Sequence, residues 1–230
     1  MTRQYKRWKK RDPAKKSKNG GEGRRIVKYI KREDYGEMSR LALVHRDENQ
    51  PDSEAYYRSY RDYVLMLLGV NCGSRIETIL EWMPSDLAGG QMTATESKTG
   101  KRVQFELNAG VYSEVKKFID FYKIGPHEFI FRKTRSSKDA ITRKTAWLRI
   151  KALAREAGIE YSVGAHSLRK SYARWLYDDG MDIHKVSRLL QHSSEETTRT
   201  YIGLTDTEVD KIRTKICNMP VSTGDGGKGK

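Results

Sequence analysis

One stretch of the chain alternates like a β-strand, and it limits the fold more than any other feature. The stretch is GGQMTATESKTGKRVQFEL, residues 89–107. Val103, Phe105 and Leu107 alternate with polar residues in its second half. The Lys-Thr-Gly sequence at 98–100 interrupts the pattern, which predicts a β-hairpin with its turn there. Because no other segment has an equally strong strand pattern, we expect a single small antiparallel sheet.

Most of the remaining chain has helix-type patterns. Apolar residues recur three and four positions apart, and Ser, Thr, Gly or Pro stand near many of the ends. The connections between these segments are short, which is typical of one compact domain. We therefore predict an α+β fold, mostly helical with a small antiparallel sheet, in which 26–217 form one domain. The predicted helices are 32–45, 53–70, 75–82, 111–123, 142–158, 164–180, 182–190, 193–204 and 205–216.

Two of these segments predict which side of the helix faces the core. A surface helix normally buries one apolar stripe and leaves its other side in water. In the segment 53–70 the predicted stripe consists of Tyr56, Tyr60, Tyr63, Val64, Leu67 and Leu68. In the segment 111–123 it consists of Val115, Phe118, Ile119 and Tyr122.

Positive charge is concentrated near the N-terminus. The formal net charge is +15, and residues 1–31 hold thirteen Lys or Arg against two acidic residues. These residues therefore carry +11, and the other 199 residues carry only +4. We predict that 1–25 form a flexible basic arm that binds DNA, and that 218–230 form a flexible tail. A membrane surface is the alternative partner of the arm, but 1–31 lack a sustained apolar face.

Other classes of protein are disfavoured by the composition. The longest apolar run, VLMLLGV at 64–70, is far shorter than the roughly 20 residues that a membrane helix needs, and the N-terminus has no apolar secretory segment. Cys72 and Cys217 lack the spacing of a disulfide framework or a zinc site, and the five His show no metal-type pairing. We therefore expect no cofactor, no metal and no membrane partner, and a cytoplasmic, nucleoid-associated protein.

The segment GAHSLRKSYARWLYDDG, residues 164–180, places three cations in the first turn of a predicted helix. They are His166, Arg169 and Lys170. A helix N-terminus has unpaired N–H groups and the positive end of the helix dipole, so it favours anions over cations. Either an anion binds at this point, or the side chains extend into solvent. Lys170 is predicted to be solvated or to contact a phosphate backbone.

A phosphate would explain these cations. Phosphodiester chemistry without a metal needs a nucleophile, an acid, a base and cations that neutralise the phosphate oxygens. Arginine suits the last task because its planar guanidinium donates to two oxygens at once. The candidate residues for such a site are Arg75, Lys98, His166, Arg169, His192 and Tyr201.

The order and spacing of these residues resemble the tyrosine recombinase (phage integrase) family over about 60–217. The motifs are His-x-Leu-Arg at 166–169, Leu-Leu-x-His at 189–192, and a Tyr nine residues after that His. All three occur in one order, which makes a chance match very improbable. The resemblance implies a helix-rich catalytic domain that cuts and rejoins DNA.

The resemblance also implies the chemical steps. Tyr201 would attack phosphorus and form a 3′-phosphotyrosyl intermediate. Lys98 would be the general acid that protonates the leaving 5′-oxygen, and His166 would be the general base or a proton shuttle toward Tyr201. The 5′-hydroxyl of a second DNA would then reseal the strand, so that neither ATP nor a divalent metal is needed.

Three further residues would hold the phosphate. Arg75 and Arg169 would bind its two non-bridging oxygens, and His192 would donate a hydrogen bond to a phosphate oxygen. The implied partners are double-stranded DNA recombination sites and three further copies of the chain in a homotetramer, with accessory DNA-bending proteins as additional candidates. Within this arrangement a helix at 205–217 would dock on a neighbouring protomer.

The chain departs from the family pattern at three places. NCGSR at 71–75 replaces the more usual Thr-Gly-Leu/Met-Arg, and Gln191 stands where the family usually has Gly. About 25 residues precede the predicted catalytic domain, where typical members have a separate helical core-binding domain. We therefore expect a compact branch of the family, in which the basic arm partly substitutes for that domain.

Two alternatives from other classes remain. The chain could be a non-catalytic DNA-binding accessory protein that keeps the fold, although all six reactive positions are filled. It could also use the same chemistry as a type IB topoisomerase or a telomere resolvase. Within the recombinase interpretation, integration, excision and inversion share one chemistry and are all compatible with these residues.

Overall fold

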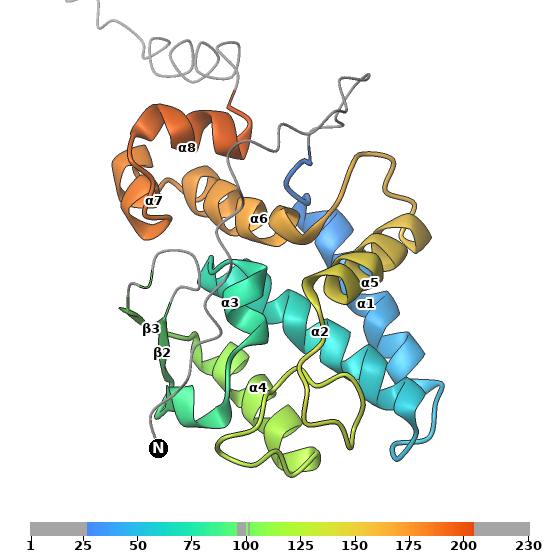
Figure 1. Ribbon diagram of the computed structural model, residues 1–230. Coiled ribbons are helices and arrows are strands. Elements are labelled where there is room, and N and C mark those ends of the chain that lie inside the picture. Colours follow the sequence, from blue (N-terminus) through green and yellow to red (C-terminus); the bar gives the residue numbers. More distant parts are fainter. Residues whose placement is uncertain (1–26, 96–99, 101, 205–230) are drawn as a thin grey trace, which may run out of the picture.

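The computed structural model describes residues 27–95, 100 and 102–204, and it has the predicted α+β fold, mostly helical with a small antiparallel sheet (Figure 1). The described part contains eight α-helices, one short 3-10 helix and a three-stranded sheet. The α-helices are α1 (Arg32–Asp47), α2 (Glu54–Cys72), α3 (Ile76–Leu80), α4 (Ala109–Phe121), α5 (Arg143–Glu156), α6 (Ala165–Asp178), α7 (Ile183–Leu189) and α8 (Glu195–Ile202). The other elements are η1 (Pro84–Asp86), β1 (Leu87–Ala88), β2 (Gln91–Thr95) and β3 (Arg102–Glu106).

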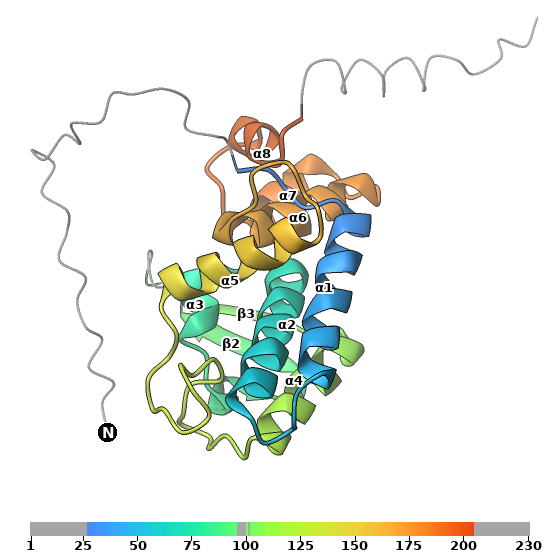
Figure 2. The ribbon, with the colours of Figure 1, turned by 90° about the vertical axis from the view of Figure 1, so that its right-hand side faces the viewer.

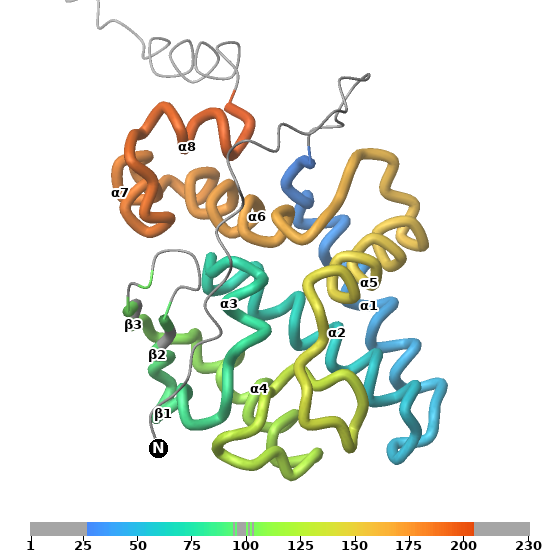
Figure 3. Tube along the Cα trace, in the orientation of Figure 1, coloured from blue at the N-terminus to red at the C-terminus, as the bar shows by residue number. Residues whose placement is uncertain are grey.

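The hydrophobic core has two parts. The larger part gathers side chains from α1 to α6 and from the sheet. The smaller part lies between α6, α7 and α8, and it consists of Ala173, Ile183, Val186, Leu190 and Ile202. Figure 3 shows α6 with α8 above it, α7 at its left-hand end, and α2 and α3 below. Helix α6 therefore contributes to both parts and joins them.

Helix α2 is buried on nearly all sides. It packs against α1, α4, α5 and α6, and Figure 2 shows it running beside α1. The predicted stripe is therefore wrong in part, because Tyr56, Tyr63 and Leu67 are only partly buried whereas Tyr57 and Met66 are fully buried. The other three residues of the stripe are buried as predicted. A helix surrounded by neighbours has no single buried stripe.

The sheet confirms the predicted hairpin and adds a third strand. Strands β2 and β3 pair antiparallel, with Gln91 opposite Glu106 and Thr95 opposite Arg102. Strand β1 pairs with the other edge of β2. Of the predicted turn at 98–100, only Gly100 is among the described residues, and its φ of +68° is a left-handed conformation that suits Gly.

The helix ends follow local capping signals. The Thr142 hydroxyl accepts a hydrogen bond from the Thr145 N–H at 3.1 Å, which confirms it as the cap of α5. Helix α4 begins two residues before the predicted start at 111, because the Asn108 side chain accepts from the Gly110 N–H at 2.9 Å. The predicted helix at 205–216 lies outside the described residues, as do the arm at 1–25 and the tail at 218–230.

Two glycines let α2 approach α6 closely. A Cβ added to Gly69 would lie 2.5 Å from Cδ1 of Leu168, and one added to Gly73 would collide with the Tyr172 ring. Gly73 also has a φ of +62° and ends α2 in a left-handed conformation. The chain therefore turns sharply after α2 and brings Arg75 next to α6.

The segment before α1 is bound to α6. The Ile30 N–H donates to Oγ of Ser171 at 2.8 Å, and Nε1 of Trp175 donates to the Ile30 carbonyl at 3.1 Å. The Ser167 hydroxyl donates to the Lys28 carbonyl at 2.6 Å. The chain therefore enters the folded body alongside α6, the helix that joins the two parts of the core.

Candidate active site

Arg169 on α6 links the two parts of the core. Its side chain is buried, with the residue only 5% exposed. Nη1 donates to the Gly73 carbonyl at 2.6 Å, and Nη2 donates to the Leu190 carbonyl at 2.7 Å. The first carbonyl belongs to the turn after α2 and the second follows α7. Two backbone groups from distant parts of the chain therefore fix the orientation of this guanidinium.

Arg75 lies near Arg169. It is the N-cap residue of α3, with extended backbone, and it is partly buried. The predicted helix at 75–82 includes Arg75, whereas in the structure Arg75 is the cap residue just before α3. Burial lowers the pKa of Arg75, and the positive charge of Arg169 lowers it further. Two guanidinium groups that repel each other in this way favour an anion that contacts both.

Tyr201 lies in the last turn of α8, beside these two arginines. Burial raises the pKa of Tyr201, whereas the charges of Arg169 and Arg75 and a hydrogen bond with Arg169 lower it. The phenol is therefore in a site where burial disfavours its charge and the arginines favour it. A nucleophile held this way is protonated at rest and is stabilised as it loses its proton.

His192 lies in the turn between α7 and α8, in contact with Tyr201. The two rings pack edge to face, with centroids 5.1 Å apart and an interplanar angle of 81°. Nδ1 of His192 is 2.9 Å from Oγ1 of Thr198. Burial lowers the pKa of His192, and the charges of Arg169 and Arg75 lower it further. The imidazole is therefore neutral at pH 7.

His166 lies in the first turn of α6, three residues before Arg169. The residue is exposed, whereas Arg169 is buried, so the two do not share one environment. Partial desolvation lowers the pKa of His166; Glu77 raises it, and Arg143, Arg169 and Lys170 lower it. Glu77 is itself paired with Arg143 at 2.7 Å. A neutral His166 can accept a proton at neutral pH.

Lys170 also lies in this cluster, although it is not one of the six candidate site residues. Its Nζ lies 5.1 Å from the centre of the Tyr201 ring, and burial lowers its pKa. Lys170 is therefore partly buried and not a freely solvated side chain, while the predicted contact with a phosphate backbone stays a prediction. No sequence spacing relates this position on α6 to the nucleophile on α8. The remaining candidate, Lys98, lies outside the described residues.

Comparison with known proteins places this arrangement in a family. The model of the phage integrase family matches residues 42–208, well over half of the chain. The chain belongs to the phage integrase family. The resemblance to tyrosine recombinases is thereby confirmed.

Two relatives illustrate how much of a phage integrase the chain covers. The probable integrase/recombinase YoeC of Bacillus subtilis is 32% identical over 148 residues, which make up 64% of this chain and 80% of YoeC. The tyrosine recombinase XerA of Pyrococcus furiosus is 28% identical over 147 residues, 63% of this chain and 51% of XerA. The match thus spans about half the length of that XerA.

Solved structures of phage integrase relatives share the fold. The crystal structure of XerA recombinase superposes with a TM-score of 0.63 at 18% identity, covering 84% of this chain and 66% of that chain. The XerH site-specific recombinase, in a post-cleavage complex with its palindromic difH substrate, gives a TM-score of 0.63 at 21% identity, covering 85% of this chain and 55% of that chain.

Gln191, the departure from the usual Gly of the family, adopts a left-handed backbone conformation with a φ of +54°. A residue with a Cβ is strained there, and Gly is not. We expect Gln191→Gly to raise the free energy of unfolding by about 1 kcal/mol, because the left-handed conformation costs about 1–2 kcal/mol and the extra backbone entropy of Gly offsets only about 0.5–1 kcal/mol of that gain. The melting temperature should rise by about 2–4 °C in thermal unfolding followed by circular dichroism.

Matched variants separate relief of strain from a general effect of glycine. Lys123 has a φ of +47°, so Lys123→Gly should also stabilise the protein. Gln104 is exposed on the extended strand β3, so Gln104→Gly should destabilise the protein. Equal melting temperatures for wild type and Gln191→Gly would contradict the assignment of strain to this position.

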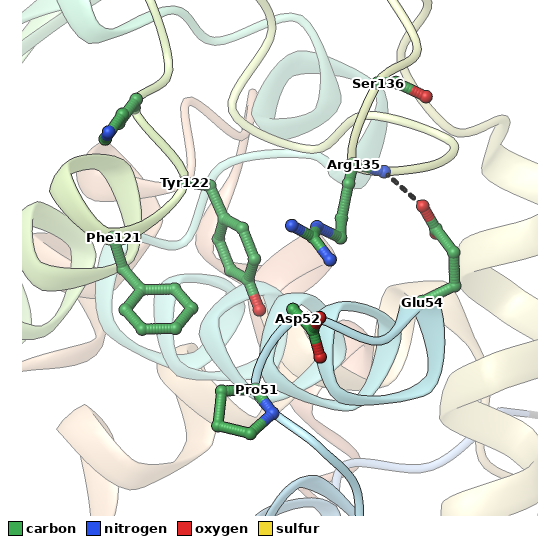
Figure 4. Close-up of a pocket in the computed structure, with 8 residues that line it drawn as sticks. Pro51, Asp52, Glu54, Phe121, Tyr122, Arg135 and Ser136 are labelled. Carbon is green, nitrogen blue, oxygen red and sulfur yellow. Dashed lines mark hydrogen bonds between the residues drawn. The ribbon is translucent and has the colours of Figure 1, made fainter.

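A hollow of about 580 Å³ lies elsewhere on the surface, at the end of the molecule away from α7 and α8 (Figure 4). Its lining includes Pro51, Phe121, Tyr122 and Arg135. None of the five candidate residues that the structure describes lines it, so this hollow is separate from the candidate site. In the part of the chain described, no group of three or more His, Cys, Asp or Glu could bind a metal ion. None of the described helices is long and apolar enough to cross a membrane.

Proposed function

We propose that this phage integrase is a site-specific DNA recombinase that cuts and rejoins DNA through Tyr201. The observation that carries the proposal is the position of the Tyr201 phenol beside Arg75 and Arg169. The phenol supplies a nucleophile, and the two guanidinium groups supply a receptor for one phosphate. The printed descriptions of YoeC and XerA, a probable integrase/recombinase and a tyrosine recombinase, support the same class.

In the proposed reaction, the Tyr201 oxygen attacks phosphorus and the bond from phosphorus to the 5′-oxygen breaks. The Tyr201 proton passes to His166, and Lys98 gives a proton to the leaving 5′-oxygen. The product is a 3′-phosphotyrosyl link and a free 5′-hydroxyl. A 5′-hydroxyl of the partner DNA then attacks the link, which restores a phosphodiester and the phenol. Because one phosphate ester replaces another in each step, no ATP is consumed.

The arginines and His192 act on the phosphate during this exchange. Charge accumulates on the non-bridging oxygens as the Tyr201 oxygen approaches, and donors already oriented toward that charge lower the barrier. Arg169 is oriented by the Gly73 and Leu190 carbonyls. His192 is neutral, so it donates one hydrogen bond without adding a charge.

The proposed partners are two duplex recombination sites and further copies of the chain in a homotetramer. XerH is described in complex with its DNA substrate, which supports DNA as the partner. Leu189 on α7 is 51% exposed and lines a hollow of about 440 Å³ beside the small core, together with Met181, Lys185 and Arg188. The apolar side chains of this hollow support the proposal that residues 205–217 of a neighbouring protomer dock there. A recombinase of this kind works at the nucleoid.

The basic arm is expected to strengthen DNA binding on every sequence. The segment 28–30 is bound to α6, so an arm that precedes it begins beside the catalytic helix. Deleting 2–24 removes ten Lys or Arg. We expect weaker binding to all duplexes, and a plot of log affinity against log salt that becomes shallower by about one unit for each phosphate that the arm no longer neutralises. Fluorescence anisotropy at several salt concentrations measures both effects.

A length-matched control tests whether charge is the cause. A variant in which the ten Lys or Arg of 2–24 are replaced by Gln should behave like the deletion. A loss of affinity for one sequence only, with an unchanged salt slope, would contradict the proposal and make the arm a specific reader of DNA.

Two experiments separate the two alternative functions from the proposed one. On a duplex nicked close to the cleavage point, a recombinase or a type IB topoisomerase accumulates a covalent adduct, and a non-catalytic accessory protein does not. A topoisomerase relaxes supercoils without exchanging strands between two sites. The DNA that flanks the gene, searched for short inverted repeats, supplies the duplex for the test.

A further inference from the structure

The hydroxyl of Thr198 contacts the imidazole of His192 on the side away from solvent. Thr198 lies in the middle of α8 and is fully buried, at 0% exposure. Its Oγ1 is 2.9 Å from Nδ1 of His192, and the same imidazole packs edge to face on the Tyr201 ring. Thr198 on α8 thus contacts His192, and the nucleophile Tyr201 lies three residues after Thr198 on the same helix.

The direction of this hydrogen bond follows from the other contacts of each group. A neutral imidazole has one N–H, so Nδ1 either accepts from the Thr198 hydroxyl or donates to it. Among the residues that the structure describes, the Thr198 hydroxyl has His192 as its hydrogen-bond partner and no other. If Nδ1 donated, the hydroxyl proton would be buried without an acceptor, which is unfavourable. The hydroxyl therefore donates, and the ring proton is on Nε2.

The neutral form of His192 is consistent with this direction. Burial and the charges of Arg169 and Arg75 all lower its pKa. A protonated ring would carry an N–H at both nitrogens, and its Nδ1 could no longer accept from Thr198. The buried hydroxyl and the two arginines thus favour the same state.

We propose that Thr198 is a positioning residue that holds His192 as the Nε2–H tautomer, so that Nε2 can donate to the scissile phosphate. The inference rests on the proposed function for the phosphate contact, but the tautomer itself does not depend on it. Without the hydroxyl, the imidazole can rotate or take its other tautomer, and a ring with its proton on Nδ1 has no proton to donate from Nε2.

Nitrogen-15 NMR of the imidazoles in the full chain without DNA tests the tautomer. In wild type we expect His192 to be protonated on Nε2, with an Nδ1 shift typical of a hydrogen-bonded acceptor. Thr198→Ser should keep that shift, and Thr198→Val, which has the same shape, should lose it. A proton on Nδ1 in wild type, or an unchanged spectrum in Thr198→Val, would overturn the proposal.

Cleavage of a nicked duplex tests the consequence. Thr198→Val should slow formation of the covalent adduct about tenfold, the equivalent of one hydrogen bond. DNA affinity and melting temperature should stay close to wild type, and Thr198→Ser should restore the rate. Thr200→Val, an exposed position on the same helix, serves as the control and should not slow cleavage. Equal slowing by the Ser and Val variants would show that the hydroxyl is not the cause and would overturn the proposal.

The two assays separate this inference from the proposed function. If wild type forms no adduct on any duplex, the proposed function fails, while the NMR result still decides whether Thr198 sets the tautomer. If wild type forms the adduct and Thr198→Val forms it at the same rate, the proposed function stands and the positioning role is overturned.

Discussion

Replacing Tyr201 by Phe is expected to abolish the covalent protein–DNA adduct while leaving the fold intact. The Phe ring can keep the edge-to-face contact with His192 and the contact with Lys170, since both involve the ring. The substitution removes only the oxygen that attacks phosphorus. Loss of a nucleophile typically costs at least about 10⁴-fold in rate. The adduct is measured on a denaturing gel after incubation with a nicked duplex in EDTA.

A second tyrosine provides the control for this experiment. Tyr177 on α6 packs at the edge of the same small core as Tyr201. Tyr177→Phe should form the adduct at the wild-type rate, because no step of the proposed reaction uses its hydroxyl. An adduct that persists in Tyr201→Phe, or one that forms in wild type only with Mg²⁺, would contradict the mechanism. No adduct with any variant would favour the non-catalytic accessory protein.

Local patterns in the sequence were sufficient for much of the fold. The alternation at 103–107 predicted the hairpin, and the Thr142 cap fixed the start of α5, because both signals act over a few neighbouring residues. The assignment of Tyr201 to the site depended on motif order, since nothing local distinguishes it from the other twelve tyrosines. The structure places its phenol beside the two arginines that the motifs named.

Other features depend on contacts between distant segments. The full burial of α2 results from packing on several sides, and its own sequence carries no record of the number of its neighbours. From the sequence alone, Lys170 is predicted to be solvated or to contact a phosphate backbone, because no motif relates it to Tyr201. Its contact with Tyr201 exists only because the small core folds α8 back onto α6.

The contacts of Arg169 with distant backbone groups could likewise not be predicted from the sequence. They lead to a prediction for the variant Arg169→Lys. The sequence assigned Arg169 one task, binding phosphate, whereas the structure gives it a structural task as well. We expect Arg169→Lys to reduce cleavage by at least about 100-fold, the typical cost of losing one oriented donor. The free energy of unfolding should also fall by about 2 kcal/mol, since one ammonium cannot reproduce two guanidinium hydrogen bonds in fixed directions and leaves a buried carbonyl unpaired.

The loss of cleavage and the loss of folding stability in Arg169→Lys have one physical origin, so they should occur together. The guanidinium donates to the Gly73 and Leu190 carbonyls, so it connects the turn that precedes Arg75 to the segment that precedes His192. Adduct formation and urea unfolding of the same preparation measure the two effects. Arg155→Lys, at an exposed position on α5, is the matched control and should change neither. If Arg169→Lys lost cleavage but kept wild-type stability, Arg169 would bind phosphate without holding the two parts of the core together.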